Sequence, residues 1–152
     1  MKKKNLWQGI LAITLVFAMT AVGCASIGRS SDDSSGDDPA LLNATWIDSN
    51  GDEVKFNNGN FETTIGGKPA HRGTYTINGN SITTTLTGIH GGIPDHKLPE
   101  SKWYTKNDLK ALGVADAGIN QIFGPYKGTY YVSASNLTIK RGMFEGTYTK
   151  KK

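Results

Sequence analysis

Few residues of this 152-residue chain could do chemistry, namely one cysteine and three histidines. His90 and His96 lie on either side of Asp95 in a loop rich in glycine and proline, and zinc accepts both imidazole and carboxylate ligands. The two histidines are six positions apart, which fits no standard ligand spacing. His71 is distant from both in sequence. We therefore expect no metal site and no cofactor.

No pattern typical of an enzyme accompanies these residues. The sequence has no Gly-x-Ser-x-Gly elbow, no phosphate-binding Gly-x-x-x-x-Gly-Lys-Ser/Thr loop, and no cysteine after Cys24 to pair with a histidine. The acidic residues Glu53, Glu62, Glu100 and Glu145 do not cluster, and most alternate with apolar residues, which places them on solvent-facing surfaces. We predict that the protein is not an enzyme.

The single cysteine directly follows an apolar run. Residues 1–5 form a basic start with three lysines, and about 15 largely apolar residues then lead from Ile10 to Cys24. This run is shorter than the roughly 20 residues that cross a bilayer as a helix. Residues 1–23 are therefore interpreted as an export signal rather than a retained membrane-spanning segment.

Ala21-Val-Gly-Cys24 resembles the lipobox of bacterial lipoproteins. The resemblance implies that a diacylglyceryl group alkylates the Cys24 thiol and that Cys24 becomes the acylated N-terminus. Two or three acyl chains hold a protein stably on a membrane. The expected partner of this chain is therefore a membrane, bound through the N-terminal lipid. We expect a lipid anchor in the cell envelope, and Ala25 favours the outer membrane or cell surface over the inner membrane. The alternative is ordinary signal-peptidase cleavage after Ala25, which would discard Cys24.

Residues 24–39 are predicted to be a flexible tether. Residues 25–39 contain five serines and four aspartates, and Ile27 is their only large apolar residue. The formal net charge of +4 comes mostly from the three lysines at the start of the chain. Without residues 1–23, 14 Lys and Arg oppose 13 Asp and Glu, which leaves +1. We therefore expect no nucleic-acid partner.

From Ala40 onward, short alternating runs bounded by Gly and Asn predict antiparallel strands. Asn-Gly pairs, the strongest short-range hairpin signal, end three of these runs. Five strands are expected by Thr87 and three more after Tyr126. In one of them, Phe61, Thr63 and Ile65 should share a face. Gly-Thr-Tyr recurs at residues 73, 128 and 146, and we interpret it as structural, because a neighbouring aromatic ring can cover bare glycine backbone.

Residues 88–125 interrupt the strand pattern and are predicted to form a short helical insertion. Thr105 and Asp108 have the spacing of a capping box, Gly113 suits a helix C-cap, and residues 115–123 could form a second helix. Their apolar residues should close one barrel opening, as a plug in preference to a lid. These residues are Trp103, Tyr104, Leu109, Leu112, Ile119 and Phe123.

Eight alternating strands predict a mainly β fold, an antiparallel meander that closes into a small barrel, because closure removes exposed strand edges. Asn43-Ala-Thr-Trp46, at the place of the lipocalin Gly-x-Trp signature, and the Gly-Thr-Tyr hairpins make residues 40–152 resemble lipocalin-like barrels of bacterial lipoproteins. The resemblance implies this fold and a ligand-binding habit.

Two functions remain open. In the preferred one, the barrel binds a small hydrophobic ligand through Trp46, Phe56, Tyr75, Trp103, Tyr104 and Tyr130. In the alternative, the barrel has a solid core and serves a structural or protein-interaction role at the cell surface. The filling of the interior distinguishes them, because small barrels have little spare volume. The bulky residues expected inside are Trp46, Phe56, Phe61, Tyr75, Tyr130, Phe144 and Tyr148.

Overall fold

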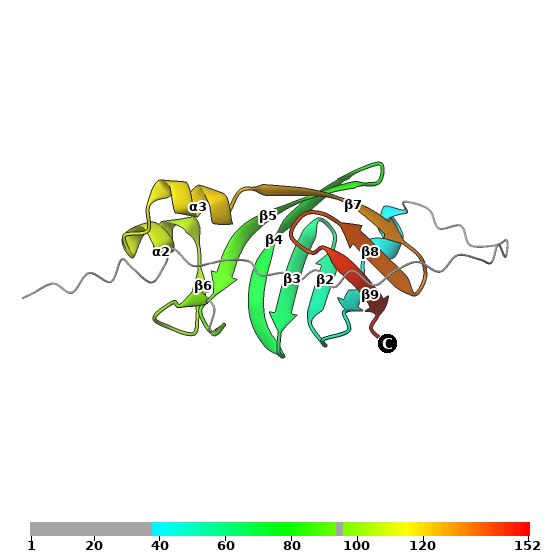
Figure 1. Ribbon diagram of the computed structural model, residues 1–152, viewed down its shortest axis with the longest axis horizontal. Coiled ribbons are helices and arrows are strands. Elements are labelled where there is room, and N and C mark those ends of the chain that lie inside the picture. Colours follow the sequence, from blue (N-terminus) through cyan, green and yellow to red (C-terminus); the bar gives the residue numbers. More distant parts are fainter. Residues whose placement is uncertain (1–37, 94–95) are drawn as a thin grey trace, which may run out of the picture. The chain divides into compact units, whose positions relative to one another are not determined.

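The computed structural model describes residues 38–93 and 96–152. The predicted export signal, Cys24 and the tether as far as residue 37 lie outside the described residues, and so does Asp95. The strands are β1 (Thr45–Ile47), β2 (Glu53–Asn57), β3 (Asn60–Ile65), β4 (Lys68–Asn78), β5 (Ser81–His90), β6 (Trp103–Tyr104), β7 (Pro125–Val132), β8 (Asn136–Lys140) and β9 (Gly146–Lys150). The helices are α1 (Pro39–Leu42), α2 (Lys106–Ala111) and α3 (Asp116–Ile122) (Figure 1).

Eight of the strands form a closed antiparallel barrel. Each pairs with the next along the chain, β5 pairs with β7, and the β1–β9 pairing completes the ring. The short β6 adds only to the end of β5, through Ile89–Tyr104 and His90–Trp103. The predicted fold, a mainly β eight-stranded meander closed into a barrel with a helical insertion, is confirmed.

The Asn-Gly signals mark the hairpins correctly. Asn58 and Gly59 form a two-residue loop between β2 and β3, and both have the positive φ angles that this loop requires, 46° and 81°. At the β4–β5 hairpin, Asn78 still pairs with Ser81, so the loop residues are Gly79 and Asn80. The signal therefore locates this turn to within one residue.

Alternation along the strands gives the barrel an apolar interior. Phe61 and Thr63 face inward as predicted, but Ile65 is 39% exposed. The register between β3 and β4 shifts between Thr63 and Thr64, and Ile65 is the last residue of β3, next to the turn. The predicted shared face therefore ends at Thr63.

The insertion contains the two predicted helices. Thr105 Oγ1 accepts a hydrogen bond from the Asp108 N–H, and the Asp108 carboxylate accepts one from the Thr105 N–H, which completes the capping box. At the other end of α2, Gly113 has φ +82° and donates to the Lys110 carbonyl, while Val114 donates to that of Leu109. These two bonds form a Schellman motif, which ends the helix.

The short helix α1 was not expected. Asp38 caps it by accepting a hydrogen bond from the Ala40 N–H at 2.9 Å, and Pro39 occupies its first turn. The last residues assigned to the tether thus belong to the folded domain. None of the helices in residues 38–93 and 96–152 is long and apolar enough to span a bilayer.

Candidate functional site

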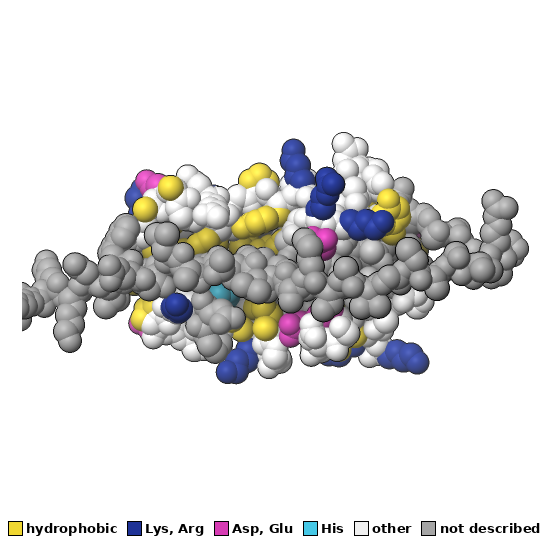
Figure 2. Space-filling view, in the orientation of Figure 1, with side chains coloured by type: hydrophobic (Ala, Val, Ile, Leu, Met, Phe, Trp, Pro, Cys, Tyr) yellow, Lys and Arg dark blue, Asp and Glu magenta, His cyan; other side chains and the backbone are white. Residues whose placement is uncertain are grey.

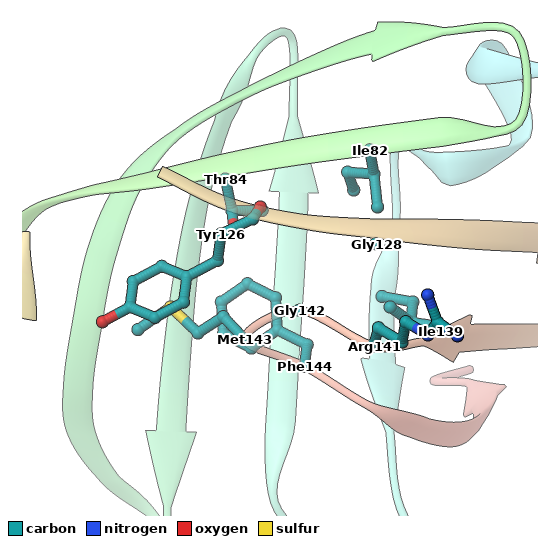
Figure 3. A pocket seen from close by; sticks show the side chains of 9 residues that line it. All are labelled: Ile82, Thr84, Tyr126, Gly128, Ile139, Arg141, Gly142, Met143 and Phe144. Carbon is teal, nitrogen blue, oxygen red and sulfur yellow. The ribbon is translucent and has the colours of Figure 1, made fainter. Parts of the chain in front are cut away.

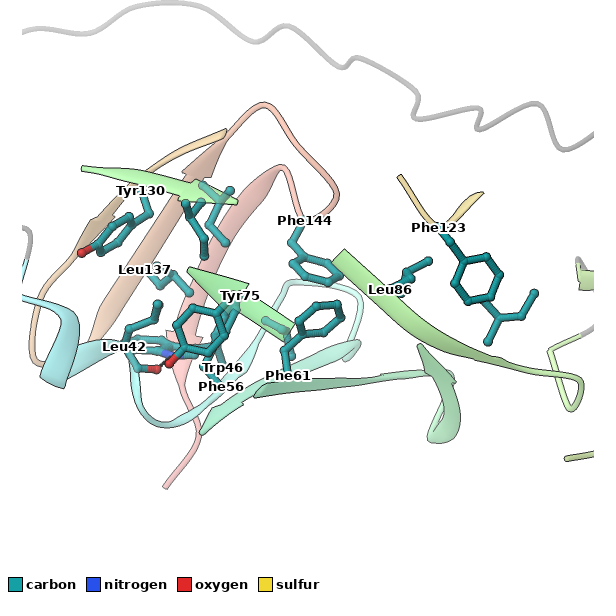
Figure 4. Packing of buried hydrophobic residues seen from close by; sticks show 14 of the residues in the cluster. Leu42, Trp46, Phe56, Phe61, Tyr75, Leu86, Phe123, Tyr130, Leu137 and Phe144 are labelled. Atoms are coloured by element: carbon teal, nitrogen blue, oxygen red, sulfur yellow. Dashed lines mark hydrogen bonds between the residues drawn. The ribbon is translucent and has the colours of Figure 1, made fainter. Parts of the chain in front are cut away.

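The barrel interior was the predicted ligand site, and aromatic rings occupy its middle (Figure 4). The Phe56 and Tyr75 ring centroids are 5.1 Å apart, and those of Phe61 and Phe144 are 4.9 Å apart. Phe56 also lies 6.2 Å from Phe144, so the rings form one continuous cluster. These are contact distances for aromatic pairs in edge-to-face packing. The rings therefore touch one another and leave no layer between them for a guest molecule.

The part of the interior next to α1 is equally filled. Trp46 and Tyr130 are fully buried, and so is Leu42 at the end of α1. Trp46 Nε1 donates to the Leu42 carbonyl at 2.9 Å, and Tyr75 Oη donates to Asn43 Oδ1 at 3.0 Å. The polar atoms of these two side chains therefore find partners within the protein.

Two hollows lie beside these side chains. A narrow cleft of about 10 Å³ lies between β7 and the β8–β9 turn, lined by residues such as Tyr126, Met143 and Phe144 (Figure 3). That volume is at the lower limit for a single water molecule. A second depression of about 170 Å³ is lined by Lys55, Asn57, Asn60, Phe61 and Glu62 of the β2–β3 hairpin. Four of these five residues are polar and exposed, so the lining does not suit an apolar ligand.

Of the six predicted ligand-binding residues, Tyr104 belongs to the same buried cluster as Trp46, Phe56, Tyr75 and Tyr130, whereas Trp103 does not. Tyr104 is buried beneath the insertion, where its Oη accepts a hydrogen bond from the Glu100 N–H at 3.0 Å. Trp103, the adjacent residue, is only half-buried, and the Arg72 guanidinium lies 4.7 Å from its ring centroid. The structure therefore gathers Trp46, Phe56, Tyr75 and Tyr130 in the interior and leaves Trp103 outside the core.

The apolar residues predicted to close the barrel mostly join its core. Leu109, Ile119 and Phe123 are buried in the same cluster as the barrel residues, which suits a plug. Leu112 differs, because it is the C-cap of α2 and is 49% exposed. Tyr148, which we expected inside, is partly buried and donates from Oη to the Phe144 carbonyl at 3.1 Å.

The three histidines, scattered in sequence, lie near one another in the fold. The ring centroids of His71 and His96 are 5.1 Å apart, and His96 Nδ1 donates to the His90 carbonyl at 2.6 Å. His71 Nδ1 lies 3.1 Å from the Thr63 hydroxyl. Burial, and then the neighbouring His96, lower the pKa of His71 to about 4. His71 is therefore uncharged at neutral pH.

These histidines do not assemble a metal centre with other described residues. Within residues 38–93 and 96–152, no three His, Cys, Asp or Glu side chains lie close enough to hold an ion. The Arg72–Trp103 stack and the His71–His96 contact carry no signal in the sequence, because each joins residues 25 or more positions apart.

Comparison of this chain with protein-family models, curated proteins and solved structures finds no match.

Proposed function

We propose that the protein is a lipid-anchored lipoprotein of the cell envelope whose solid barrel serves as a non-catalytic structural or protein-interaction module. The filled interior is the observation that supports this function. Sites for small molecules usually enclose about 300–1,000 Å³, whereas the cleft beside Phe144 has about 10 Å³. With no room inside, the outer surface of the barrel is the part available to partners.

The sequence supports the anchor. Cys24, the only cysteine, ends an apolar run that follows a basic start, in the context that resembles a lipobox. When cells that express the full chain are grown with radioactive palmitate, the protein should become labelled. A Cys24→Ser variant should carry no label. Equal labelling of both chains, or of neither, would contradict the proposed anchor.

Displacement of a fluorescent fatty acid separates the solid barrel from a ligand carrier. We expect the full chain to take up none of the probe, because the rings of Phe61 and Phe144 occupy the middle of the interior. A known fatty-acid carrier assayed in parallel is the positive control for uptake of the probe. Saturable uptake by the wild type, near one probe per chain, would favour the apolar-ligand hypothesis instead.

A further inference from the structure

Acidic residues are unevenly distributed around the barrel wall. Of the eight barrel strands, only β2 and β3 contain one, Glu53 and Glu62 respectively. The four strands β4, β5, β7 and β8 are consecutive neighbours in the sheet, and none contains an Asp or Glu. Their basic residues are Lys68, Arg72, Lys127 and Lys140. Because β7 is four strands from β2 in either direction around the ring, β7 lies opposite β2.

Strands β7 and β8 of this wall combine positive charge, hydroxyl groups and one exposed aromatic ring. Cross-strand neighbours there are Thr129 with Lys140 and Tyr131 with Thr138, on the outward sides of β7 and β8. Tyr131 is 46% exposed, and Lys140 Nζ lies 5.4 Å from its ring centroid. We call the basic face the set Lys127, Thr129, Tyr131, Thr138 and Lys140, which are on the outward sides of β7 and β8.

No residue of the basic face forms an ion pair within the described part of the chain. The ion pairs there join Lys102 to Glu100, Lys110 to Asp116 and Lys151 to Glu53, and none involves a residue of the basic face. Figure 2 shows Lys and Arg side chains projecting above the region that β7 and β8 occupy in Figure 1. Unpaired cations on an exposed strand face are available to an anionic partner.

We propose that the basic face docks on the anionic phospholipid headgroups of the membrane that holds the anchor. The inference rests on the proposed function, because it assumes the lipid anchor. Lysine and arginine attract anionic headgroups, and hydroxyls such as those of Thr129 and Thr138 can donate hydrogen bonds to phosphate oxygens. A tyrosine with an apolar ring and a polar tip, like Tyr131, is suited to the membrane–water interface.

The length of the chain before the barrel favours the membrane over a soluble polyanion. Cys24 and Pro39 are 15 positions apart, so even a fully extended chain would span at most about 54 Å between them. An anchored barrel therefore stays near the bilayer, and docking becomes an intramolecular step at a high effective concentration. A weak electrostatic surface suffices under these conditions.

The position of Tyr131 provides the test. The full chain, purified from membranes of expressing cells, is reconstituted into vesicles as a Tyr131→Cys variant carrying an environment-sensitive fluorophore. We expect a blue shift of the fluorophore's emission in vesicles with 30% phosphatidylglycerol and none in pure phosphatidylcholine. Salt at 0.5 M should reverse the shift, because it shortens the electrostatic screening length to a few ångströms. The matched control is the Asn57→Cys variant, because Asn57 is exposed on β2, and its label should not shift. The parent chain, whose Cys24 is acylated, is the blank.

Charge variants test the basic face while the fluorophore stays at residue 131. In the Tyr131→Cys background, Lys127→Gln with Lys140→Gln should lower the ratio of docked to undocked protein about 25-fold, since one basic residue near an anionic surface contributes about fivefold. Lys55→Gln with Lys110→Gln makes the same change in net charge away from the basic face and should leave the ratio unchanged. Equal effects of the two pairs would overturn the proposal.

The outcomes also separate the docking surface from the anchor. A full chain that fails to float with pure phosphatidylcholine vesicles has no lipid anchor, and the proposed function fails. A chain that floats, but whose label at residue 131 emits identically in neutral and anionic vesicles, is anchored without docking, and this inference alone fails. Salt-sensitive retention on a heparin column without the blue shift also overturns it and points to a polyanion partner.

Discussion

Gly73 shows how one missing side chain shapes the barrel wall. A Cβ at this position would lie 2.2 Å from the Thr85 carbonyl oxygen and 2.7 Å from the Phe61 ring, which covers the glycine from the neighbouring strand. The Gly-Thr-Tyr repeat is therefore structural at Gly73, where we had inferred a packing role. We expect Gly73→Ala to lower the free energy of unfolding by about 2–3 kcal/mol, measured in denaturant, because backbone and a buried ring must both move.

Gly118 is the matched control for this substitution. It lies in α3, and the nearest atom to an added Cβ is 3.7 Å away, an ordinary contact. Gly118→Ala should raise stability by up to about 1 kcal/mol, since alanine favours the helix. A similar loss in both variants would mean that the close approach at Gly73 does not determine the effect.

His71 should make stability depend on pH. Its pKa of about 4 in the folded protein lies below the ordinary value of 6.5, so the unfolded chain binds the proton more readily. The stability due to neutral His71 is fully present above pH 6.5 and is lost as the pH falls toward 4, by about 1 kcal/mol per pH unit between 6 and 5. Denaturant unfolding at several pH values should show this slope in the wild type and lack it in His71→Asn.

The neighbouring histidine gives a graded control for that slope. In the His96→Gln variant the charge beside His71 is absent but the burial remains, and burial is the larger cause of the lowered pKa. The slope should therefore decrease only in part. Complete loss in His96→Gln would assign the shift to the charge of His96 instead of to burial.

At the scale of single elements, the capping box should hold α2 in place. Thr105→Ala removes the hydroxyl that bonds both the backbone N–H and the carboxylate of Asp108, and lost N-caps cost about 1 kcal/mol. Amide hydrogen exchange within Lys106–Ala111 should therefore become about fivefold faster. Asn107→Ala, in the same turn and exposed, should leave the exchange rates unchanged. Faster exchange throughout the barrel in Thr105→Ala would show that the insertion and the barrel unfold together.

The elements that the sequence predicted are those defined by neighbouring residues. The strands follow from alternation, and α2 follows from a capping box and a glycine that lie within eight residues of one another. The helix α1 was missed because its four residues carry no periodicity, and its place depends on burial of Leu42 and on the Trp46 hydrogen bond. The predicted face of Ile65 was wrong, because the register shift between β3 and β4 depends on the partner strand.

The candidate site could be predicted only in part for the same reason. Alternation was enough to place Trp46, Phe56, Tyr75 and Tyr130 in the interior. Whether their rings leave a space depends on how side chains from opposite walls meet, which no local pattern contains. Nor does any local pattern contain the position of Trp103, because it depends on the pairing of β6 with β5.

At the scale of the whole molecule, the closed barrel and its aromatic filling depend on each other. Eight strands enclose an interior that side chains can just fill, and Phe144 reaches into it from the turn between β8 and β9 to meet Phe56 and Phe61. Filling the interior thus stabilises the barrel and, at the same time, leaves no place for a carried ligand. Removing one ring should reverse both effects together.

Phe144→Ala should therefore produce a less stable barrel that binds a small apolar molecule. Loss of a nearly buried phenylalanine ring should cost about 3 kcal/mol, measured by denaturant unfolding, because both transfer energy and packing are lost. An apolar cavity left by a removed aromatic ring stays dry and can accept benzene. Saturating benzene should therefore raise the midpoint of thermal unfolding of this variant and leave that of the wild type unchanged. Leu112→Ala, which truncates an exposed side chain, should change stability by less than about 0.5 kcal/mol and gain no response to benzene. Stabilisation of the wild type by benzene would show that the interior already has room for a guest, because a ligand stabilises only a state that it binds.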